Sequence, residues 1–376
     1  MSKETFIIDG LRSPIGLKNG NLVGMRPDDL ASNVVKVLLE RNPSLETKYI
    51  EDIVVGCAFP EGSQGMLMAR GISIMSGIPK EAGAKIVNRL CGSSMDAAHQ
   101  ISQAIDSGDI NCGIAGGTED MFGVPMGGYM PSFNPILFEE EYYIGMGETA
   151  ENLAKDLDIS REDQEEFSIS SHNKALKAIS DGKFLNEICP IEFNENTINQ
   201  DEGPRIPDVD KMKSLDPAFD ADGTVTAATS SPISIGASAI LLGSRKFTKE
   251  NNIETKYKIV SRAIAGVDWK TMGAGPLPAT QKALDKAGMQ ISDIDAIELN
   301  EAFAAQSLYV IRKGGWDRGK VNLNGGAIAL GHPLGCSGAR IIVTLMNVLS
   351  QRDLNVGLAT MCIGSGQGIA TVIERV

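Results

Sequence analysis

Histidine is rare in this chain, and cysteine never occurs in close pairs. Only three of the 376 residues are histidine, and the six cysteines, at positions 57, 91, 112, 189, 336 and 362, show no CxxC spacing. Structural zinc sites and disulfide-stabilised small domains both need such residues at short, repeated spacings. The pattern therefore argues against a metal site and a disulfide framework, and it predicts a reducing, cytoplasmic location.

Long apolar runs and basic clusters are also missing. No stretch reaches the roughly 18 consecutive apolar residues that a membrane-spanning helix needs, and the N-terminal MSKETFIIDGLRSP lacks the pattern of a signal peptide. The formal net charge is −13, whereas nucleic-acid binding requires clustered Lys and Arg. We expect neither membrane insertion nor nucleic-acid binding, and an anionic substrate would need a locally positive site.

What the chain does have is a repeated pattern of short apolar runs. At 376 residues it exceeds the size at which one core usually keeps growing, so we expect two core units. Apolar runs that predict strands alternate with helical patterns, which indicates an α/β protein. The predicted strands cover residues 6–9, 52–56, 85–88, 112–117, 296–299, 321–324, 356–361 and 369–374.

Two parts of the sequence resemble each other. VNRL, a turn with Cys91, a helix and GDINCGIAGG match VNLN, a long turn, a helix and RDLNVGLATM, which predicts two related halves. The looser stretch between them, residues 121–219, predicts an inserted loop domain that covers a site. The predicted division is an N-terminal half of residues 1–120 plus about 220–255, this loop domain, and a C-terminal half of residues 256–376.

Cys91 is the first candidate for chemistry. In VNRLCGSSMDAAHQI it follows an apolar run and precedes a predicted helix. Free backbone N–H groups and the positive end of the helix dipole lower a thiol pKa there and favour a thiolate nucleophile. The small residues Gly92, Ser93 and Ser94 leave room for a substrate carbonyl and for N–H groups that hold an oxyanion. A cysteine that packs as a small apolar residue is the alternative.

Two further candidates lie in glycine-rich loops near the C-terminus. His332 sits between Gly331 and Pro333 in NGGAIALGHPLGCSGAR, a loop that should hold an imidazole on a rigid turn. Cys362 ends an apolar strand and precedes the glycines of MCIGSGQG, and α/β proteins place ligands at such strand ends. No Lys-Ser/Thr pair follows these glycines, which disfavours a nucleotide-binding loop. A structural role is the alternative for both side chains.

Asn300 and Glu301 form a polar pair in ELNEAFAAQ. They lie between an apolar strand and a helix that we expect to start at Ala302. Such a pair suits a helix N-cap, and it equally suits an amide that holds a catalytic water.

Together these motifs resemble those of the thiolase family along nearly the whole chain. CGSS at Cys91, NEAF at 300–303, GHP at 331–333 and CIG at 362–364 carry the resemblance in order and spacing. GMGETAENLA, DGTVTAATSS and MGAGPLPA also resemble family segments. The resemblance implies the thiolase fold, in which two similar βαβαβαββ halves stack in five α-β-α-β-α layers with a loop domain inserted into the first half.

The resemblance also implies a mechanism. The enzyme would be an acyltransferase that cleaves 3-ketoacyl-CoA with CoA to acetyl-CoA and a shortened acyl-CoA, through an acyl-cysteine intermediate. Cys91 would be the nucleophile, His332 would accept its proton, and Cys362 would be the second acid/base. One oxyanion site would be His332 with a water held by Asn300, and the other the backbone N–H groups of Cys91 and Gly364.

Coenzyme A would then be a substrate, with no permanently bound cofactor. Arg205 in DEGPRIP resembles the family's phosphate contact, Ser231 resembles the serine near the pantetheine arm, and Met146 is a further substrate-binding candidate. Lys211 and Lys213 are additional basic candidates, and a solvated loop charge is the alternative for these basic residues. We expect a homodimer or homotetramer, with a multifunctional β-oxidation enzyme as a candidate partner.

Four positions depart from the family pattern. Ser94 and Ser365 replace glycines of the two cysteine motifs, Ile235 replaces an aspartate, and Asp216 replaces an arginine. A side chain where glycine is usual predicts crowding of the catalytic turns. These departures bear on CoA-loop geometry and turnover rate and leave the expected reaction type unchanged.

Gly145 indicates a branch of the family. Acetoacetyl-specific biosynthetic members carry a histidine at this position, and Thr229-Ser230 resembles the β-oxidation branch. A smaller residue beside the acyl pocket predicts longer substrates, although one methylene changes binding by only about 1–3 kcal/mol. The alternatives are a biosynthetic acetoacetyl-CoA enzyme and a catalytically impaired CoA-binding subunit. A decarboxylating ketoacyl synthase needs a second active-site histidine, which His99 and His172 do not resemble.

Overall fold

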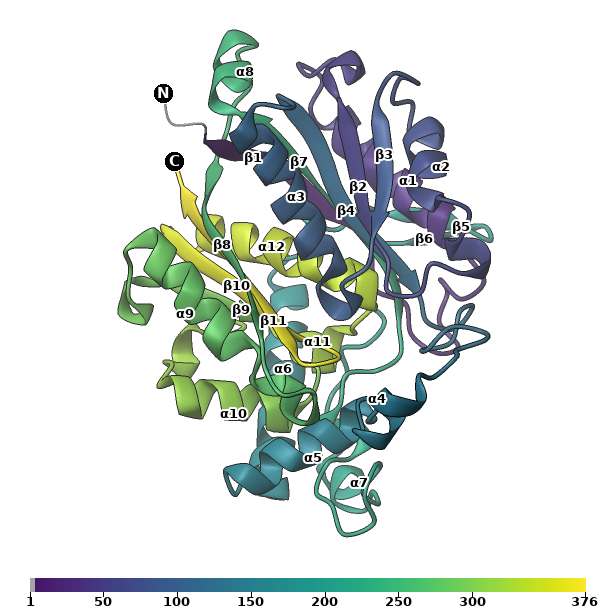
Figure 1. The fold of residues 1–376 in the computed structure, drawn as a ribbon, viewed down its shortest axis with the longest axis vertical. Helices are drawn as coiled ribbons and strands as arrows, with labels where there is room; N and C mark the ends of the chain where they lie inside the picture. Colours follow the sequence, from purple (N-terminus) through teal and green to yellow (C-terminus); the bar gives the residue numbers. More distant parts are fainter. Residues whose placement is uncertain (1–3) are drawn as a thin grey trace.

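A nine-stranded mixed sheet runs through the protein (Figure 1). The computed structural model describes residues 4–376. The strands are β1 (Thr5–Arg12), β2 (Asp52–Gly56), β3 (Gly83–Val87), β4 (Cys112–Asp120), β5 (Ile191–Phe193), β6 (Asn196–Ile198), β7 (Ile235–Ser244), β8 (Tyr257–Gly266), β9 (Ala296–Leu299), β10 (Val356–Ile363) and β11 (Gln367–Arg375). The sheet order is β3-β2-β4-β7-β1-β8-β11-β10-β9, and β5 and β6 form a separate hairpin.

Helices cover both sides of this sheet and fill the space between its two parts. They are α1 (Pro27–Glu40), α2 (Met68–Met75), α3 (Ser93–Ser107), α4 (Pro135–Glu139), α5 (Met146–Asp156), α6 (Arg161–Ser180), α7 (Val209–Lys213), α8 (Arg245–Glu250), α9 (Pro276–Ala287), α10 (Ala304–Gly314), α11 (Ala327–Leu330) and α12 (Leu334–Gln351). β1 and β8 share only two residue pairs, so the sheet divides at this seam. The helices α3 and α12 pack side by side between the two parts, while α1 and α9 cover the outer faces. The predicted five α-β-α-β-α layers are confirmed.

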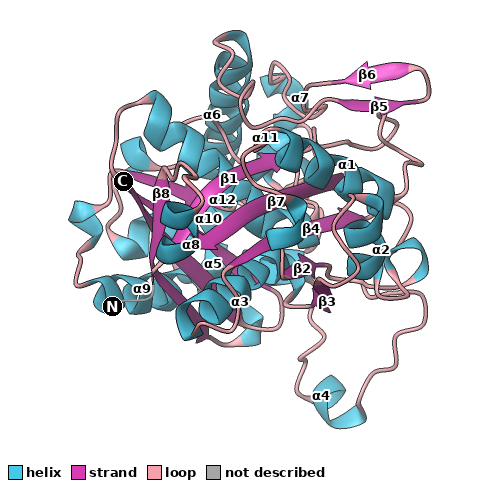
Figure 2. Ribbon diagram, turned by 90° about the horizontal axis from the view of Figure 1, so that it is seen from above, coloured by secondary structure: helices cyan, strands magenta, loops and turns pink. Residues whose placement is uncertain are grey.

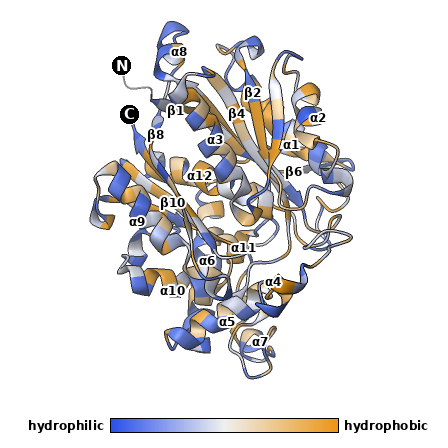
Figure 3. Ribbon diagram, in the orientation of Figure 1, coloured by the Kyte–Doolittle hydropathy of each residue, from blue (hydrophilic) through white to orange (hydrophobic). Residues whose placement is uncertain are grey.

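The central helix α12 owes its place to its composition. Its sequence, LGCSGARIIVTLMNVLSQ, is apolar or small on nearly every side, and all but three of its residues are buried. A helix that is apolar all round is stable only where it is enclosed. Figure 3 shows the contrast between α12 and the strands, which are mostly apolar, and the polar outer surfaces of the peripheral helices.

The prediction of a strand at residues 321–324 is wrong, whereas the other predicted strands are present. Val321 forms a single parallel bridge with Ile297. The next residue, Asn322, has a positive φ of 47°, and its side chain binds both the N–H and the C=O of Leu299, at 2.9 and 2.8 Å. An asparagine side chain that bonds to the neighbouring strand in this way replaces a backbone ladder.

Two central strands were not foreseen. β7 has the sequence IGASAILLGS and β8 the sequence YKIVSRAIAG. Glycine and alanine are depleted in strands, so their local propensity is weak. Tertiary contacts compensate, because β7 pairs along its length with β4 and β1 and is buried over nearly all of its length.

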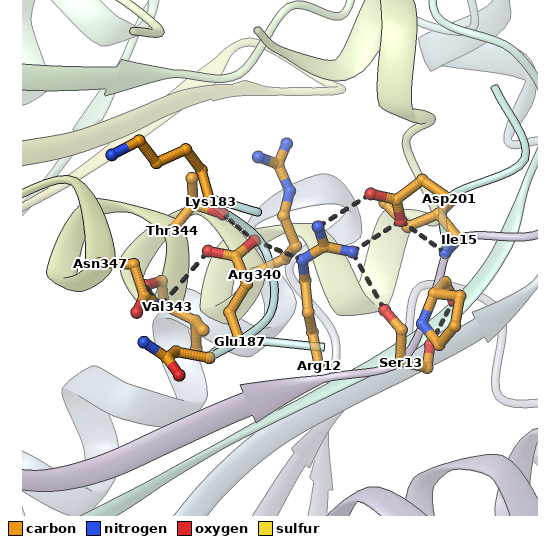
Figure 4. A network of polar contacts seen from close by, with 12 residues as sticks. Arg12, Ser13, Ile15, Lys183, Glu187, Asp201, Arg340, Val343, Thr344 and Asn347 are labelled. Atoms are coloured by element: carbon orange, nitrogen blue, oxygen red, sulfur yellow. Dashed lines mark hydrogen bonds and ion pairs between the residues drawn. The ribbon is translucent and has the colours of Figure 1, made fainter. Parts of the chain in front are cut away.

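The segment between β4 and β7 holds the hairpin β5–β6 and the helices α4 to α7. The residues on either side of the hairpin are anchored to the sheet through Arg12 (Figure 4). Arg12 donates to Glu187 at 2.7 Å and to both carboxylate oxygens of Asp201 at 2.6 and 2.9 Å. All three side chains are fully enclosed, and Thr344 of α12 also donates to Glu187. The division into two halves and a loop domain stays a proposal. Residues 1–3 of the predicted N-terminal half lie outside the described residues.

Helix lengths and hydropathy bear on membrane insertion. Within residues 4–376, no helix combines the length and the apolar character needed to cross a bilayer.

Replacement of Arg12 is predicted to destabilise the protein strongly. Arg12→Ala leaves the buried carboxylates of Glu187 and Asp201 without their cation, which should lower the free energy of unfolding by about 3–5 kcal/mol. Arg26→Ala removes a half-exposed ion pair with Asp28 and should cost less than about 1 kcal/mol. Urea unfolding of both variants measures the difference, and equal losses would contradict a structural role for the network.

Candidate active site

Cys91 lies on a strained turn just before α3. The preceding residue, Leu90, has a φ of +44°, in the left-handed region that non-glycine residues avoid. Ser93 stabilises this turn, because its hydroxyl donates to the Leu90 carbonyl at 2.6 Å. Gly92 is needed for packing, since a Cβ there would lie 2.6 Å from the Ile363 side chain. The turn therefore presses the cysteine against the end of β10.

Burial dominates the chemistry of the Cys91 thiol. The residue is 9% exposed, and burial raises its pKa to about 11, although the N–H of Gly364 and its own N–H oppose the shift. This direction is opposite to the one predicted from the helix start, because desolvation outweighs both N–H contacts. The resting side chain is a neutral thiol that needs a base before it can act as a nucleophile.

Cys362 lies opposite, at the end of β10. Burial raises the pKa of its thiol, and the negative charge of a Cys91 thiolate raises it further. The two sulfurs are thus close enough for the charge of one to disfavour ionisation of the other. Met146, at the start of α5, lies against the same turn, since its sulfur is 3.4 Å from where a Cβ on Gly364 would stand.

His332 is held as a neutral base. Its Nδ1 is 2.6 Å from the hydroxyl of Ser337, and that hydroxyl is 2.9 Å from the Pro333 carbonyl, to which it donates. The hydroxyl oxygen therefore accepts from Nδ1–H, which leaves the lone pair on Nε2. Burial first, and the positive charge of Arg340 second, lower the pKa of His332 to about 3.

Asn300 faces this lone pair and is not a helix N-cap. Helix α10 begins at Ala304, two residues later than expected, and its N-cap position is occupied by Phe303. The Asn300 amide nitrogen lies 3.3 Å from His332 Nε2. Its amide oxygen is buried with no partner among the described residues. A buried oxygen of this kind normally binds a protein donor or an ordered water.

Contacts between elements bring these residues together. The turn that carries Cys91 packs against both α12, which follows His332, and β10, which carries Cys362. Cys91, Cys362, His332, Asn300, Gly364 and Met146 thus share one region of the structure.

Two buried glutamates support this region. Glu119 was missed from the sequence, and Glu301 was considered there only as part of the polar pair with Asn300. Glu301 accepts hydrogen bonds from Ser171 of α6, at 2.6 Å, and from Asn322, at 2.8 Å. Glu119 accepts from the backbone N–H groups of Ala58 and Gly335, at 2.7 and 2.8 Å. Carboxylates in the apolar contexts AIELNEAF and CGIAGGTED were the available signal, because charged residues are rarely buried without partners.

The predicted CoA-binding residues lie in a neighbouring area. Arg205 and Lys211 line a hollow of about 160 Å³ together with His172 and two alanines of the turn 227–229. Ser231 follows that turn, and its N–H donates to the carbonyl of Ala302 at 3.0 Å. The segment from the turn 227–229 to Ser231 therefore connects the hollow to the NEAF segment at residues 300–303. Lys213 is exposed and does not line the hollow.

The four departures from the family pattern have different outcomes. Ser365 has a φ of +62°, a conformation that costs a non-glycine residue about 1–2 kcal/mol. Ser94 does not crowd its turn, because it is helical and its buried hydroxyl is hydrogen-bonded to α12. Ile235 is buried in β7, and Asp216 is exposed. Only Ser365 strains a backbone position.

Metal binding finds no support in the geometry. Over residues 4–376, no group of three or more His, Cys, Asp or Glu side chains is arranged to hold an ion.

A layered α/β fold with two buried cysteines near a neutral histidine suits acyl transfer. Residues 5–246 match the family model described as Thiolase, N-terminal domain, and residues 253–375 match Thiolase, C-terminal domain. The chain therefore belongs to the thiolase family and is an acyltransferase.

Individual relatives agree with this assignment. The chain is 48% identical to a 3-ketoacyl-CoA thiolase of Shewanella loihica, over 99% of this chain and 100% of the relative. It is 47% identical to a 3-ketoacyl-CoA thiolase of Aeromonas salmonicida, with all of both chains covered. The crystal structure of the Bacillus anthracis acetyl-CoA acetyltransferase matches with a TM-score of 0.91 at 35% identity, over 100% of this chain and 99% of that one.

Alkylation of Cys91 should reveal its resting protonation state. Since the thiol pKa is about 11 and His332 stays neutral down to about pH 3, the rate of reaction with iodoacetamide should rise steadily from pH 6 to pH 9. Cys91→Ser measures the background from the other cysteines. A plateau between pH 5 and pH 8 would instead reveal a preformed thiolate–imidazolium pair and contradict this state.

Proposed function

We propose that this chain is a 3-ketoacyl-CoA thiolase. It would cleave 3-ketoacyl-CoA with CoA to acetyl-CoA and a shortened acyl-CoA, and catalyse the reverse Claisen condensation. The observation that carries the proposal is that the turn with the buried Cys91 packs against both β10, which carries the buried Cys362, and α12, which follows the buried His332. One thiol suffices for acyl transfer, whereas carbon–carbon cleavage needs a second proton carrier.

In the proposed first step, Nε2 of His332 takes the proton of Cys91, and the thiolate attacks the 3-keto carbon. The oxygen of that carbon gains negative charge, and the N–H groups of Cys91 and Gly364, which both favour the thiolate, are suited to receive it. The C2–C3 bond then breaks, which leaves the shortened acyl group on sulfur. Cys362 gives its proton to C2 of the departing acetyl-CoA.

Asn300 would help to stabilise the negative charge that develops on the leaving acetyl-CoA. When the C2–C3 bond breaks, the thioester oxygen of the leaving acetyl-CoA becomes an enolate oxygen. His332, protonated in the first step, and a water bound to the free amide oxygen of Asn300 are suited to stabilise it. CoA then gives its thiol proton to the Cys362 thiolate and attacks the acyl-cysteine, and Cys91 leaves as a thiolate that regains its proton from His332.

CoA itself would bind as a substrate across the path from the Arg205 hollow to Ser231. Arg205 and Lys211 supply positive charge in a chain of net charge −13, as phosphate groups require. Half-buried Ser231 lies beside the NEAF segment, where the pantetheine arm must end. Met146 would contact the thioester end, because it lies against Gly364.

Removal of this positive charge should weaken CoA binding without slowing the chemistry. The double variant Arg205→Ala with Lys211→Ala is expected to raise KM for CoA about tenfold, with kcat nearly unchanged, because both side chains are exposed and exposed ion pairs contribute at most about 1 kcal/mol each. Lys213→Ala, a nearby lysine outside the hollow, is the matched control. If the double variant lowered kcat and left KM for CoA unchanged, the proposed binding of CoA phosphates at this hollow would be wrong.

The acyl chain would extend past Gly145. A hollow of about 900 Å³ lies beside this residue and is lined by Phe138, Tyr143, Ile144 and Phe219 as well as by polar residues. The ring of Phe219 also packs on Phe303, with centroids 5.8 Å apart. Gly145 has no side chain to block the route, which supports the degradative, β-oxidation branch.

Thiolysis of 3-ketoacyl-CoA substrates from about four to sixteen carbons tests both the reaction and the branch of the family. Each methylene in the acyl pocket is expected to change transition-state binding by about 1–3 kcal/mol. We expect activity on long chains that disappears in Cys91→Ala. Gly145→His should reduce long-chain activity more than acetoacetyl-CoA activity. The backbone tolerates this change, since Gly145 has a φ of −67° and a Cβ there would meet only the Glu148 side chain, at 3.5 Å or more.

Two results would overturn this assignment. Activity confined to acetoacetyl-CoA would favour a biosynthetic acetyl-CoA acetyltransferase. The absence of Cys91-dependent activity at every chain length, with CoA still bound, would favour the impaired CoA-binding subunit.

Assembly is also part of the proposal. The strand β3 is at the edge of the sheet, and four exposed apolar residues lie nearby in sequence, namely Met66, Leu67, Ile74 and Met75. Such an edge suits pairing with a second copy, so we propose a homodimer or homotetramer located in the cytoplasm. The α4 segment projects from the body in Figure 2 and carries the exposed apolar residues Met130, Phe133 and Ile136, which suit a multifunctional β-oxidation partner.

A further inference from the structure

Ser94 links the helix behind the cysteine to the helix behind the histidine. It is the second residue of α3, three positions after Cys91, and its side chain is fully buried. Its hydroxyl donates to the Cys336 carbonyl at 3.0 Å and accepts from the Ala339 N–H at 2.9 Å. A single side chain of α3 therefore binds one carbonyl and one amide of α12.

The turn that Ser94 binds is also the turn that orients the base. Ser337, which accepts the Nδ1–H of His332, lies between Cys336 and Ala339. A shift of this turn relative to α3 would therefore move the imidazole relative to Cys91. Misplacement by about 1 Å can cost two orders of magnitude in rate.

Close packing leaves the hydroxyl little freedom. A Cβ on Gly117 would lie 2.7 Å from the Ser94 Cβ, and one on Gly338 would lie 2.7 Å from the Met95 Cβ. Glycines thus allow α3, α12 and β4 to approach closely. Contacts this dense fix a side chain in one orientation.

We propose that Ser94 is a positioning residue, which holds the nucleophile Cys91 and the base His332 in their working arrangement. The inference rests on the proposed roles of those two residues. It also gives a reason for a hydroxyl at this position, because glycine would leave the two helices in contact without this hydrogen-bonded bridge between them.

Ser238 provides a matched control. Its hydroxyl donates to the same Cys336 carbonyl, at 2.7 Å, and it is nearly as buried. It belongs to β7 and not to the helix that follows Cys91. If Ser94 only donates a hydrogen bond to the Cys336 carbonyl, its removal should affect kcat as little as removal of Ser238. If Ser94 positions the nucleophile, its removal should lower kcat more.

The test compares Ser94→Ala with Ser238→Ala. We expect both to lower thermal stability, and only Ser94→Ala to lower kcat, by about tenfold to a hundredfold with KM unchanged. Ser94→Ala should also slow iodoacetamide alkylation of Cys91 at pH 7.5 and shift its pH profile, whereas Ser238→Ala should not. Ser94→Gly, which also lacks the hydroxyl, should show the same losses.

Equal effects of the two variants on kcat and alkylation, or no effect of Ser94→Ala on either, would overturn the proposal. Alkylation needs no substrate, so it tests the positioning role independently of thiolysis. A wild-type chain without thiolase activity would refute the proposed function alone, and an active wild type matched by Ser94→Ala would refute only the positioning role.

Discussion

The structure depends on one packing constraint, the contact of α3 and α12 between the two parts of the sheet. α12 is almost wholly enclosed and most of α3 is buried, and the residues just before these helices, Cys91 and His332, are brought to one region by their contact. Dense packing allows the helices only one relative position. The strained Leu90 turn, the glycine contacts and the hydroxyl of Ser94 all act at this junction, where stability and catalytic geometry have the same physical origin.

Buried charged side chains form a second group of constraints. Glu119, Glu301 and Glu187 are each compensated by several donors, as buried carboxylates must be. Arg340 of α12 is less well compensated, since it is 3.8 Å from Glu298 and has no hydrogen-bond partner among the described residues. Burial raises the pKa of Glu298 to about 8. Burial lowers the pKa of Arg340 as well, and its positive charge adds to the burial that lowers the pKa of His332.

Much of this could be predicted from the sequence where a feature is local. Apolar periodicity, the turn before α3 and the loop around His332 each lie in a few consecutive residues. Features that depend on distant contacts could not be predicted. The strands β7 and β8 have weak local propensity, Asn322 replaces a strand with its side chain, and the direction of the Cys91 pKa shift follows from burial by other segments. The same is true of the long-range hydrogen bonds formed by Glu119, Glu301 and Ser94, since their partners lie in distant segments.

The Arg12 network has a consequence for synthesis on the ribosome. Arg12 emerges early, yet its partners Glu187 and Asp201 follow 175 and 189 residues later. At about 5–20 residues per second, the guanidinium waits roughly ten to forty seconds for its carboxylates. The neighbours of β1 in the sheet, β7 and β8, are made later still. The first strand of the chain is thus among the last to reach its final surroundings, and its exposed apolar residues need protection until then.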